Sequence, residues 1–176
     1  MVYTNYAGRS DVKPTIVAIE KKKVVGLGSK FISILNPKES NGPGIIPPLW
    51  QAFNRREDEI QHRISGASIG YCEPLPLQSA SSTGECFYLA CVEVSEFSNL
   101  PSGMETREIP AGRYAVFTHR GKLNTLPETY REIYAGWLPG SGEKRTASAE
   151  FELYDQRFKD GSDDSEFDIY IPLQRR

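Results

Sequence analysis

The sequence has no long apolar run and no apolar segment behind a basic start. None of its hydrophobic stretches is long enough to cross a bilayer, and the opening residues MVYTNYAGRSDVKPT do not have the pattern of a secretory signal. A membrane-spanning or secreted protein is therefore not expected. The sequence predicts a cytoplasmic protein with no membrane partner.

Cysteine and histidine are scarce, with three cysteines and two histidines in 176 residues. Cys72, Cys86 and Cys91 form no C-x-x-C pair, and an odd number of cysteines does not suit a secreted disulfide framework. His62 and His119 do not lie at ligand spacing from the cysteines or from carboxylates. We expect reduced cysteines that serve in packing, no metal site and no cofactor.

The sequence also lacks a strong excess of charge of either sign. Its formal net charge is -2, which gives no overall attraction for a phosphate backbone or an anionic membrane. The three lysines at 21–23 have no interleaved aromatic residues, so they are interpreted as a solvated strand face rather than a nucleic-acid platform. No direct nucleic-acid partner is expected.

What the sequence does contain is typical of one globular domain. Hydrophobic residues make up 39% and charged residues 25% of the chain, and 176 residues can bury a substantial core. The first 12 residues are rich in Gly, Ser, Asn and Tyr and are interpreted as a tail. We therefore expect a tail at 1–12 and a single domain at 13–176.

One unit is written twice along the chain. The first half predicts a strand at 14–35, a turn-rich stretch at 36–44, a helix opened by Pro47 and ending near Gly66, and strands at 67–72 and 86–94. The second half predicts strands and a helix in the same order, at 105–119, 126–138, 147–154 and 166–173. The fold class expected is α+β: a duplicated β-α-β-β unit with pseudo-two-fold symmetry, its antiparallel sheet or sheets packed with two main helices.

Residue correspondences support the repeat. Pro47, Trp50 and Phe53 match Pro127, Tyr130 and Ile133 in spacing, and A-S-I-G-Y at 67–71 aligns with E-F-E-L-Y at 150–154. Halves of this size, at about 13–95 and 103–174, are small to be stable alone, so a shared core is expected, with a ligand cleft where they meet.

Four motifs in the second half resemble one known family. They are I-P-A-G-R-Y-A-V-F-T-H-R-G at 109–121, the helix with Tyr130, Ile133 and Tyr134 that ends G-W-L-P-G-S-G at 136–142, F-E-L-Y-D-Q-R-F at 151–158, and I-Y-I-P-L at 169–173. Together they resemble the GyrI-like or AraC-type effector-binding family, as does F-Y-L-A-C-V-E-V at 87–94, where Cys91 replaces a common glycine. The resemblance covers 14–173. It implies a duplicated β-α-β-β fold with a ligand cleft, often fused to a DNA-binding domain, although this sequence is expected to be a stand-alone member.

Glu152 is the carboxylate singled out by strand alternation. Glu150, Glu152 and Tyr154 should point to one face of their strand, and the apolar residues between them to the other. A buried carboxylate needs a cation or hydrogen-bond donors, so a cationic, flat ligand suits Glu152 if it faces the cleft. The resemblance implies the same role. Glu150 is interpreted as a surface charge, with a helper role as the alternative.

Aromatic residues surround the predicted cleft. Tyr130, Tyr134 and Trp137 share one helical stripe, and Trp137 is expected to overhang the cleft. An aromatic stripe is more often core than pocket, so part of this set is expected to join helix to sheet. No catalytic residue is assigned. The candidate ligand-binding residues are Glu152, Trp137, Tyr134, Tyr154, Tyr130, Tyr71, Tyr88 and Trp50.

Three functions are compatible with this pattern. The leading hypothesis is a binder that senses or sequesters a cationic or amphipathic drug-like molecule or metabolite. A hydrolase that uses Glu152 as a general base is the second, although no partner group for transition-state stabilisation is evident. The third is a protein-interaction module of gyrase-inhibitor type, with a protein partner or a homodimer. The shape of the cleft depends on loops 36–44 and 75–85, whose conformation the sequence does not predict.

Overall fold

The computed structural model describes residues 13–33, 36, 38–75 and 84–175. The predicted tail at 1–12 and most of the predicted loop at 75–85 lie outside the described residues.

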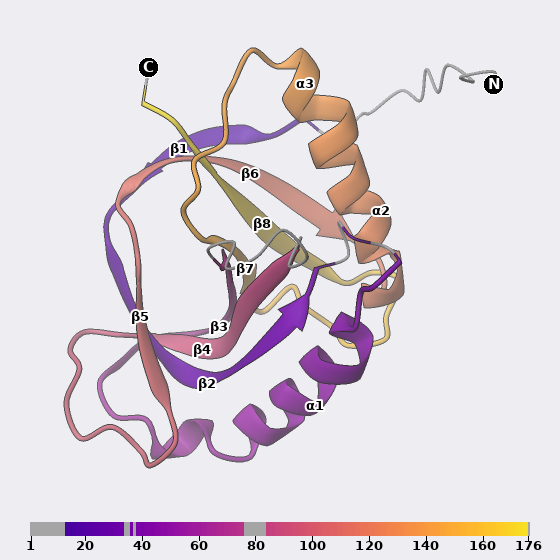
Figure 1. Cartoon of the computed structure of the whole chain (residues 1–176). Coiled ribbons are helices and arrows are strands. Elements are labelled where there is room, and N and C mark those ends of the chain that lie inside the picture. Colours follow the sequence, from indigo (N-terminus) through magenta and orange to yellow (C-terminus); the bar gives the residue numbers. More distant parts are fainter. Residues whose placement is uncertain (1–12, 34–35, 37, 76–83, 176) are drawn as a thin grey trace.

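The described residues form an eight-stranded antiparallel sheet in the order β1-β6-β8-β7-β3-β4-β2-β5 (Figure 1). Its strands bury side chains on one or both of their faces. They carry many β-branched and aromatic residues, which favour the extended backbone. The strands are β1 (Thr15–Ile19), β2 (Lys22–Ile32), β3 (Arg63–Pro74), β4 (Glu85–Val94), β5 (Glu105–Ile109), β6 (Gly112–Arg120), β7 (Glu150–Tyr154) and β8 (Glu166–Leu173).

The strand order confirms the duplication. Exchanging β1 with β5, β2 with β6, β3 with β7 and β4 with β8 reverses the order and leaves the pairing unchanged. Each half is β-β-α-β-β, because the predicted strands at 14–35 and 105–119 are each divided by a two-residue connection, at 20–21 and 110–111. The first strand of each half pairs in the other half, β1 with β6 and β5 with β2. The halves are therefore joined by an exchange of edge strands as well as by the central pair β3–β7.

The sheet curls so that its two edges approach each other. β5 lies at one edge, yet only Pro110 and Ala111 separate it from β6, which is next to the other edge. The inside of the curl holds an apolar core to which both halves contribute, including Val24, Leu89, Tyr114 and Phe151.

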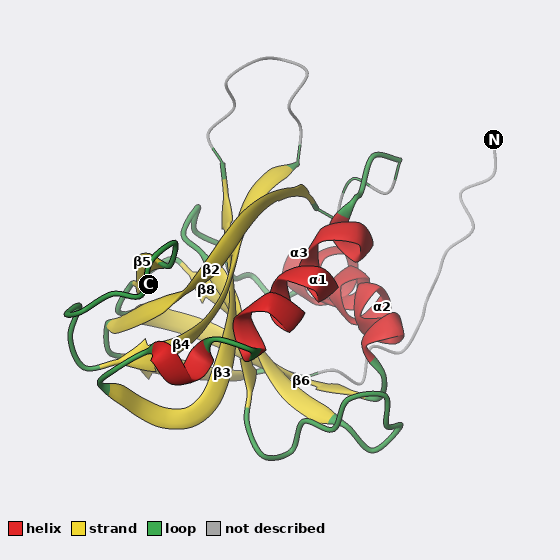
Figure 2. Ribbon diagram, turned by 90° about the horizontal axis from the view of Figure 1, so that it is seen from below, coloured by secondary structure: helices red, strands yellow, loops and turns green. Residues whose placement is uncertain are grey.

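Helices cover the opposite face of the sheet. The first half contributes α1 (Gly42–Asn54) with the short 3-10 segment η1 (Glu57–Glu59). The second contributes η2 (Leu123–Thr125), α2 (Leu126–Arg131), the π-helical segment η3 (Glu132–Trp137) and α3 (Leu138–Gly140). Figure 2 shows α1 and the α2–α3 segment on the same side of the sheet. No helix within the described ranges has the length and apolar character needed to cross a membrane.

The first helix differs from the prediction at both ends. It begins at Gly42, inside the stretch predicted as a turn, with Pro43 in its first turn and Pro47 and Pro48 in its interior. It ends at Asn54 rather than near Gly66, so Ile64 lies in β3 and is 57% exposed. Ile60 still packs under α1 although its backbone is extended. Apolar spacing over one turn does not distinguish a helix from a chain that returns to the same core.

Candidate functional site

The central strand β7 presents two faces of opposite character, as strand alternation predicts. Phe151 packs in the core inside the curl, whereas Glu150, Glu152 and Tyr154 lie on the face covered by the helices. Glu152 is only 6% exposed. A carboxylate therefore lies at the middle of the sheet, on the face that the helices cover.

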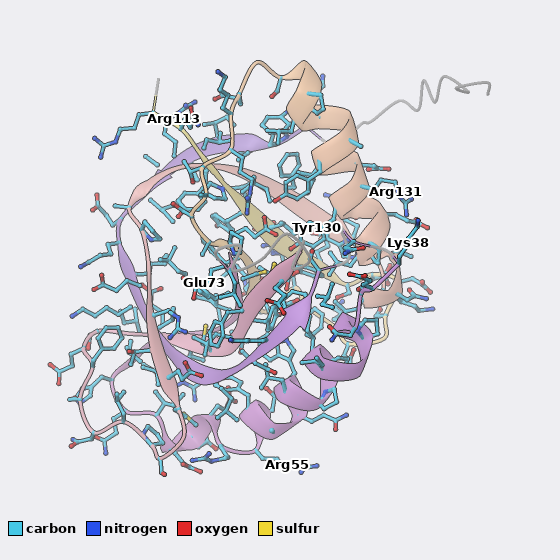
Figure 3. All side chains as sticks on the ribbon, viewed as in Figure 1. Lys38, Arg55, Glu73, Arg113, Tyr130 and Arg131 are labelled. Atoms are coloured by element: carbon cyan, nitrogen blue, oxygen red, sulfur yellow. The ribbon has the colours of Figure 1, made fainter. Side chains whose placement is uncertain are left out.

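Three tyrosine hydroxyls donate hydrogen bonds to the Glu152 carboxylate. Tyr130 of α2 donates to Oε1 at 2.8 Å, Tyr154 of β7 to Oε2 at 2.7 Å, and Tyr88 of β4 to Oε2 at 3.1 Å. Figure 3 shows Tyr130 pointing into the molecule from α2, while the neighbouring Arg131 points away from it. Tyr88 belongs to the first half and Tyr130 to the second, so Glu152 joins the two halves.

Trp50 completes this group from α1. Its Nε1 donates to the Tyr88 hydroxyl at 3.1 Å, and its ring lies 5.4 Å from the Tyr154 ring at an interplanar angle of 80°. The structure thus brings together five of the predicted residues, namely Glu152, Tyr88, Tyr130, Tyr154 and Trp50. Their role in ligand binding stays a prediction.

Within the described part of the chain, the side chains that donate hydrogen bonds to the Glu152 carboxylate are all tyrosine hydroxyls. Burial raises the pKa of Glu152, the three tyrosine hydrogen bonds oppose that rise, and the nearby Glu150 adds to it. No arginine or lysine among the described residues forms a salt bridge with Glu152, although thirteen such bridges elsewhere join a Lys or Arg to a carboxylate. An opposite charge within contact distance would favour the ionised form of such a buried carboxylate.

Glu150 is buried, so its interpretation as a surface charge is wrong. It is 8% exposed and accepts hydrogen bonds from the Tyr134 hydroxyl and from Arg145 Nη2, the latter at 3.2 Å. Burial raises the pKa of Glu150, and the Arg145 guanidinium opposes that rise. The face of β7 therefore carries two buried carboxylates, of which one is paired with a cation.

The aromatic stripe of the second helix divides between the two carboxylates and the core. The rings of Tyr130 and Tyr134 stack with centroids 6.4 Å apart and planes 13° apart. Trp137 lies further along, in the π-helical segment, and packs edge-on against Phe117 at 5.1 Å. The stripe thus joins helix to sheet through Trp137 and reaches the carboxylates through the two tyrosines. The predicted overhang of Trp137 stays a prediction.

Tyr71 does not join this group. It packs in the core inside the curl, on the opposite face of the sheet, and donates to Glu73 Oε2 at 2.7 Å. The expected alignment of 67–71 with 150–154 is shifted by one residue, and such a shift moves every side chain to the other face. When the paired strands are matched from β1 and β5 onward, the counterpart of Glu152 is Gly70, which is also its partner across β3–β7.

Two residues of the site are absent from the predicted set. A Cβ atom at Gly70 would lie 2.2 Å from the Tyr88 hydroxyl and 2.8 Å from Glu152 Oε2, so the glycine leaves room for that hydrogen bond. A glycine inside a strand pattern is a signal of close approach and could have indicated it. Arg145 reaches Glu150 from the irregular segment before β7, and no motif marks it.

Metal ligands do not cluster in the part of the chain that the structure describes, where no group of three or more His, Cys, Asp or Glu side chains is arranged to hold an ion. The chemistry available at Glu152 is instead that of a carboxylate, hydroxyls and aromatic rings. Such a set recognises charge and flat apolar surface.

A family model described as the GyrI-like small molecule binding domain matches residues 13–174. The chain belongs to the GyrI-like family. Among curated proteins, the transcriptional regulator BrlR of Pseudomonas aeruginosa is 38% identical to this GyrI-like chain over 136 residues, which are 76% of the chain and 48% of BrlR. The chain therefore spans about half the length of that relative.

Solved structures show the same GyrI-like fold. A bacterial transcription regulation protein from Staphylococcus aureus MU50 matches with a TM-score of 0.70 at 14% identity, over 93% of this chain and 99% of that one. The structure of SAV2435 bound to tetraphenylphosphonium matches with a TM-score of 0.69 at 15% identity, over 92% of this chain and 94% of that one. At these identities the likeness establishes a curled antiparallel sheet with two helical segments.

Proposed function

We propose that this GyrI-like domain binds a cationic, aromatic small molecule over Glu152 and thereby senses or sequesters it. The observation that carries the proposal is the state of Glu152, a buried carboxylate whose partners among the described residues are tyrosine hydroxyls and no cation. The family itself is one of small-molecule binding domains.

The physical case rests on how the buried charge is compensated. Hydrogen bonds lower the cost of the ionised carboxylate, yet burial still raises the pKa of Glu152 above its ordinary range. A ligand cation within contact distance would supply the missing opposite charge. The rings of Trp50 and Tyr154 meet beside it at 5.4 Å. A cation against such a ring gains about 0.5 to 2 kcal/mol, depending on how far the site is dehydrated.

Two comparisons agree with this proposal. The SAV2435 structure holds tetraphenylphosphonium, a bulky aromatic monocation. BrlR, a transcriptional regulator, matches this chain along 48% of its own length, which supports a sensing role in regulation.

The test is a titration of the chain with tetraphenylphosphonium and planar cationic dyes, followed by quenching of tryptophan fluorescence. We expect Glu152→Gln, which removes the charge and nearly keeps the shape, to weaken binding about tenfold or more, equivalent to about 1.4 kcal/mol. Glu132→Gln is the matched control, because Glu132 is exposed on the neighbouring helical segment and loses the same charge.

The result that would overturn the proposal is equal affinity of the wild type and Glu152→Gln, or no cation binding by either. Recovered ligand is measured in the same samples by mass spectrometry. A binder returns the compound unchanged, whereas conversion of many equivalents per chain would identify a hydrolase in which Glu152 acts as a base.

A further inference from the structure

The two buried carboxylates of β7 differ in how their charges are compensated. Glu150 and Glu152 lie on one face of the strand, two residues apart, so their backbones are separated by about 7 Å. Glu150 is paired with Arg145, whereas the hydrogen-bond partners of Glu152 are Tyr88, Tyr130 and Tyr154.

Arg145 occupies a cage of the same chemical kind as the one proposed for a ligand. Its Nη2 contacts Glu150 Oε2 at 3.2 Å, and its guanidinium carbon lies 5.8 Å from the centroid of the Tyr134 ring. The Tyr134 hydroxyl donates to the same carboxylate. A carboxylate, a tyrosine hydroxyl and an aromatic face therefore already hold one cation, which the chain itself supplies.

We propose that Arg145 sets the charge of the ligand, so that the site selects compounds with a single positive charge and rejects compounds with two. This inference rests on the proposed function. Two carboxylates and one guanidinium leave one negative charge beneath the helices, at Glu152. A second cationic centre on the ligand, placed about two residues along β7 from Glu152, would lie next to the Arg145 guanidinium. The two positive charges would repel each other.

Removal of the arginine charge should reverse this preference. Arg145→Gln leaves Glu150 without its cation, at a spacing from Glu152 that a rigid dication can span. Glu150→Gln does the opposite, because it leaves the guanidinium uncompensated beside Glu152. The double variant Arg145→Gln/Glu150→Gln removes one charge of each sign and restores the original balance.

The test compares methyl viologen, a rigid aromatic dication, with N-methyl-phenylpyridinium, a monocation on nearly the same ring frame. Each is titrated by calorimetry into the whole chain as wild type, the two single variants and the double variant. Lys144→Gln is the matched control, because Lys144 is the exposed neighbour of Arg145 and carries the same charge. A thermal melt verifies that each variant is folded.

We expect the wild type to prefer the monocation. Arg145→Gln should raise the ratio of dication to monocation affinity about tenfold or more, because the Glu150 carboxylate then has no cation of the chain to compensate it. Glu150→Gln should weaken monocation binding, and the double variant should return the ratio to the wild-type value. If Arg145→Gln does not fold, these last two variants still decide the matter.

An unchanged ratio in folded Arg145→Gln, or wild-type monocation affinity in Glu150→Gln, would overturn the inference while leaving cation binding at Glu152 intact. Failure of the wild type to bind tetraphenylphosphonium would instead remove the proposed function, and the charge rule with it. The two failures are therefore distinguishable.

Discussion

We expect the carboxylates of β7 to make the stability of the fold and the proposed affinity for a cation depend on pH in opposite directions. Burial raises the pKa of both Glu150 and Glu152 above that of a glutamate in the unfolded chain. The folded state then binds more protons than the unfolded state, so this stabilisation is complete below the unfolded pKa and is lost as pH rises through the folded pKa. Cation binding needs the ionised carboxylate, so affinity for tetraphenylphosphonium should rise across the same window.

Thermal melts and fluorescence titrations over a pH series, from the ordinary glutamate range upward, measure both effects. The tyrosines around Glu152 do not titrate there, because burial raises their pKa as well. Glu152→Gln should flatten the affinity curve and make the stability curve shallower, because the raised pKa of Glu150 remains. A wild-type affinity that stays constant while the melting temperature changes would contradict this prediction.

At the scale of residues, strand alternation alone predicts which side chains of β7 share a face. It places Glu152 and Tyr154 together and Phe151 on the other face, as the structure has them. It does not predict Arg145, because a long side chain from an irregular segment can reach Glu150 from many directions. Tyr71 was misplaced because a weak internal repeat does not determine an alignment to within one residue, and one residue decides the face.

At the scale of elements, the buried His119 links the end of β6 to α2 through a hydrogen bond with Thr129. His119 is 1% exposed, with Nδ1 2.8 Å from Thr129 Oγ1 and Nε2 3.3 Å from the Lys122 carbonyl. A carbonyl only accepts, so Nε2 carries the proton and the Thr129 hydroxyl donates to Nδ1. Burial lowers the pKa of His119, which keeps the ring neutral.

Thr129→Val removes this donor while keeping the shape of the side chain. We expect it to lower the free energy of unfolding by about 1 kcal/mol, because the buried Nδ1 then has no hydrogen-bond donor. Urea unfolding measures the loss, and Glu128→Gln on the exposed side of the same turn is the control. Equal stability of Thr129→Val and the wild type would show that this bond does not hold the helix.

Strands were easier to predict than helix ends. The expected strands at 86–94 and 166–173 agree with β4 and β8 to within one residue, because each is a short apolar run bounded by turn residues. The start of α1 was predicted too late, at Pro47, because Pro47 and Pro48 suit the first turn of a helix. Pro43 occupies that turn instead. The π-helical segment η3 could not be predicted from the spacing of apolar residues. Its wider turn shifts Trp137 relative to Tyr130, and the composition of the segment does not reveal this.

At the scale of the whole molecule, the exchange of β1 and β5 should make the halves unable to fold separately. A fragment of residues 100–175 loses the partner of β5, the outer neighbour of β6 and the partner of β7 at the centre of the sheet. We expect this fragment and the complementary fragment 13–99 to be unfolded alone by circular dichroism, and to recover the native spectrum when mixed. A fragment that folds cooperatively by itself would contradict this expectation.

The order of elements in the whole fold follows from the repeat, but the pairing between halves does not. Periodicity identifies each strand and helix from its own residues. The partner of an edge strand depends on contacts far away in sequence, so the pairing of β1 with β6 leaves no local pattern.

The pair Gly70–Glu152 shows what covalent joining of two similar halves permits. Two identical copies of one half, related by the same two-fold axis, would place the same residue at both members of this central pair. A carboxylate there would face its own copy, and burial of two like charges in contact is costly. In a single chain, positions 70 and 152 can carry different residues, so an acidic residue can lie opposite a glycine. A single buried carboxylate is then possible at the centre of a nearly symmetric sheet.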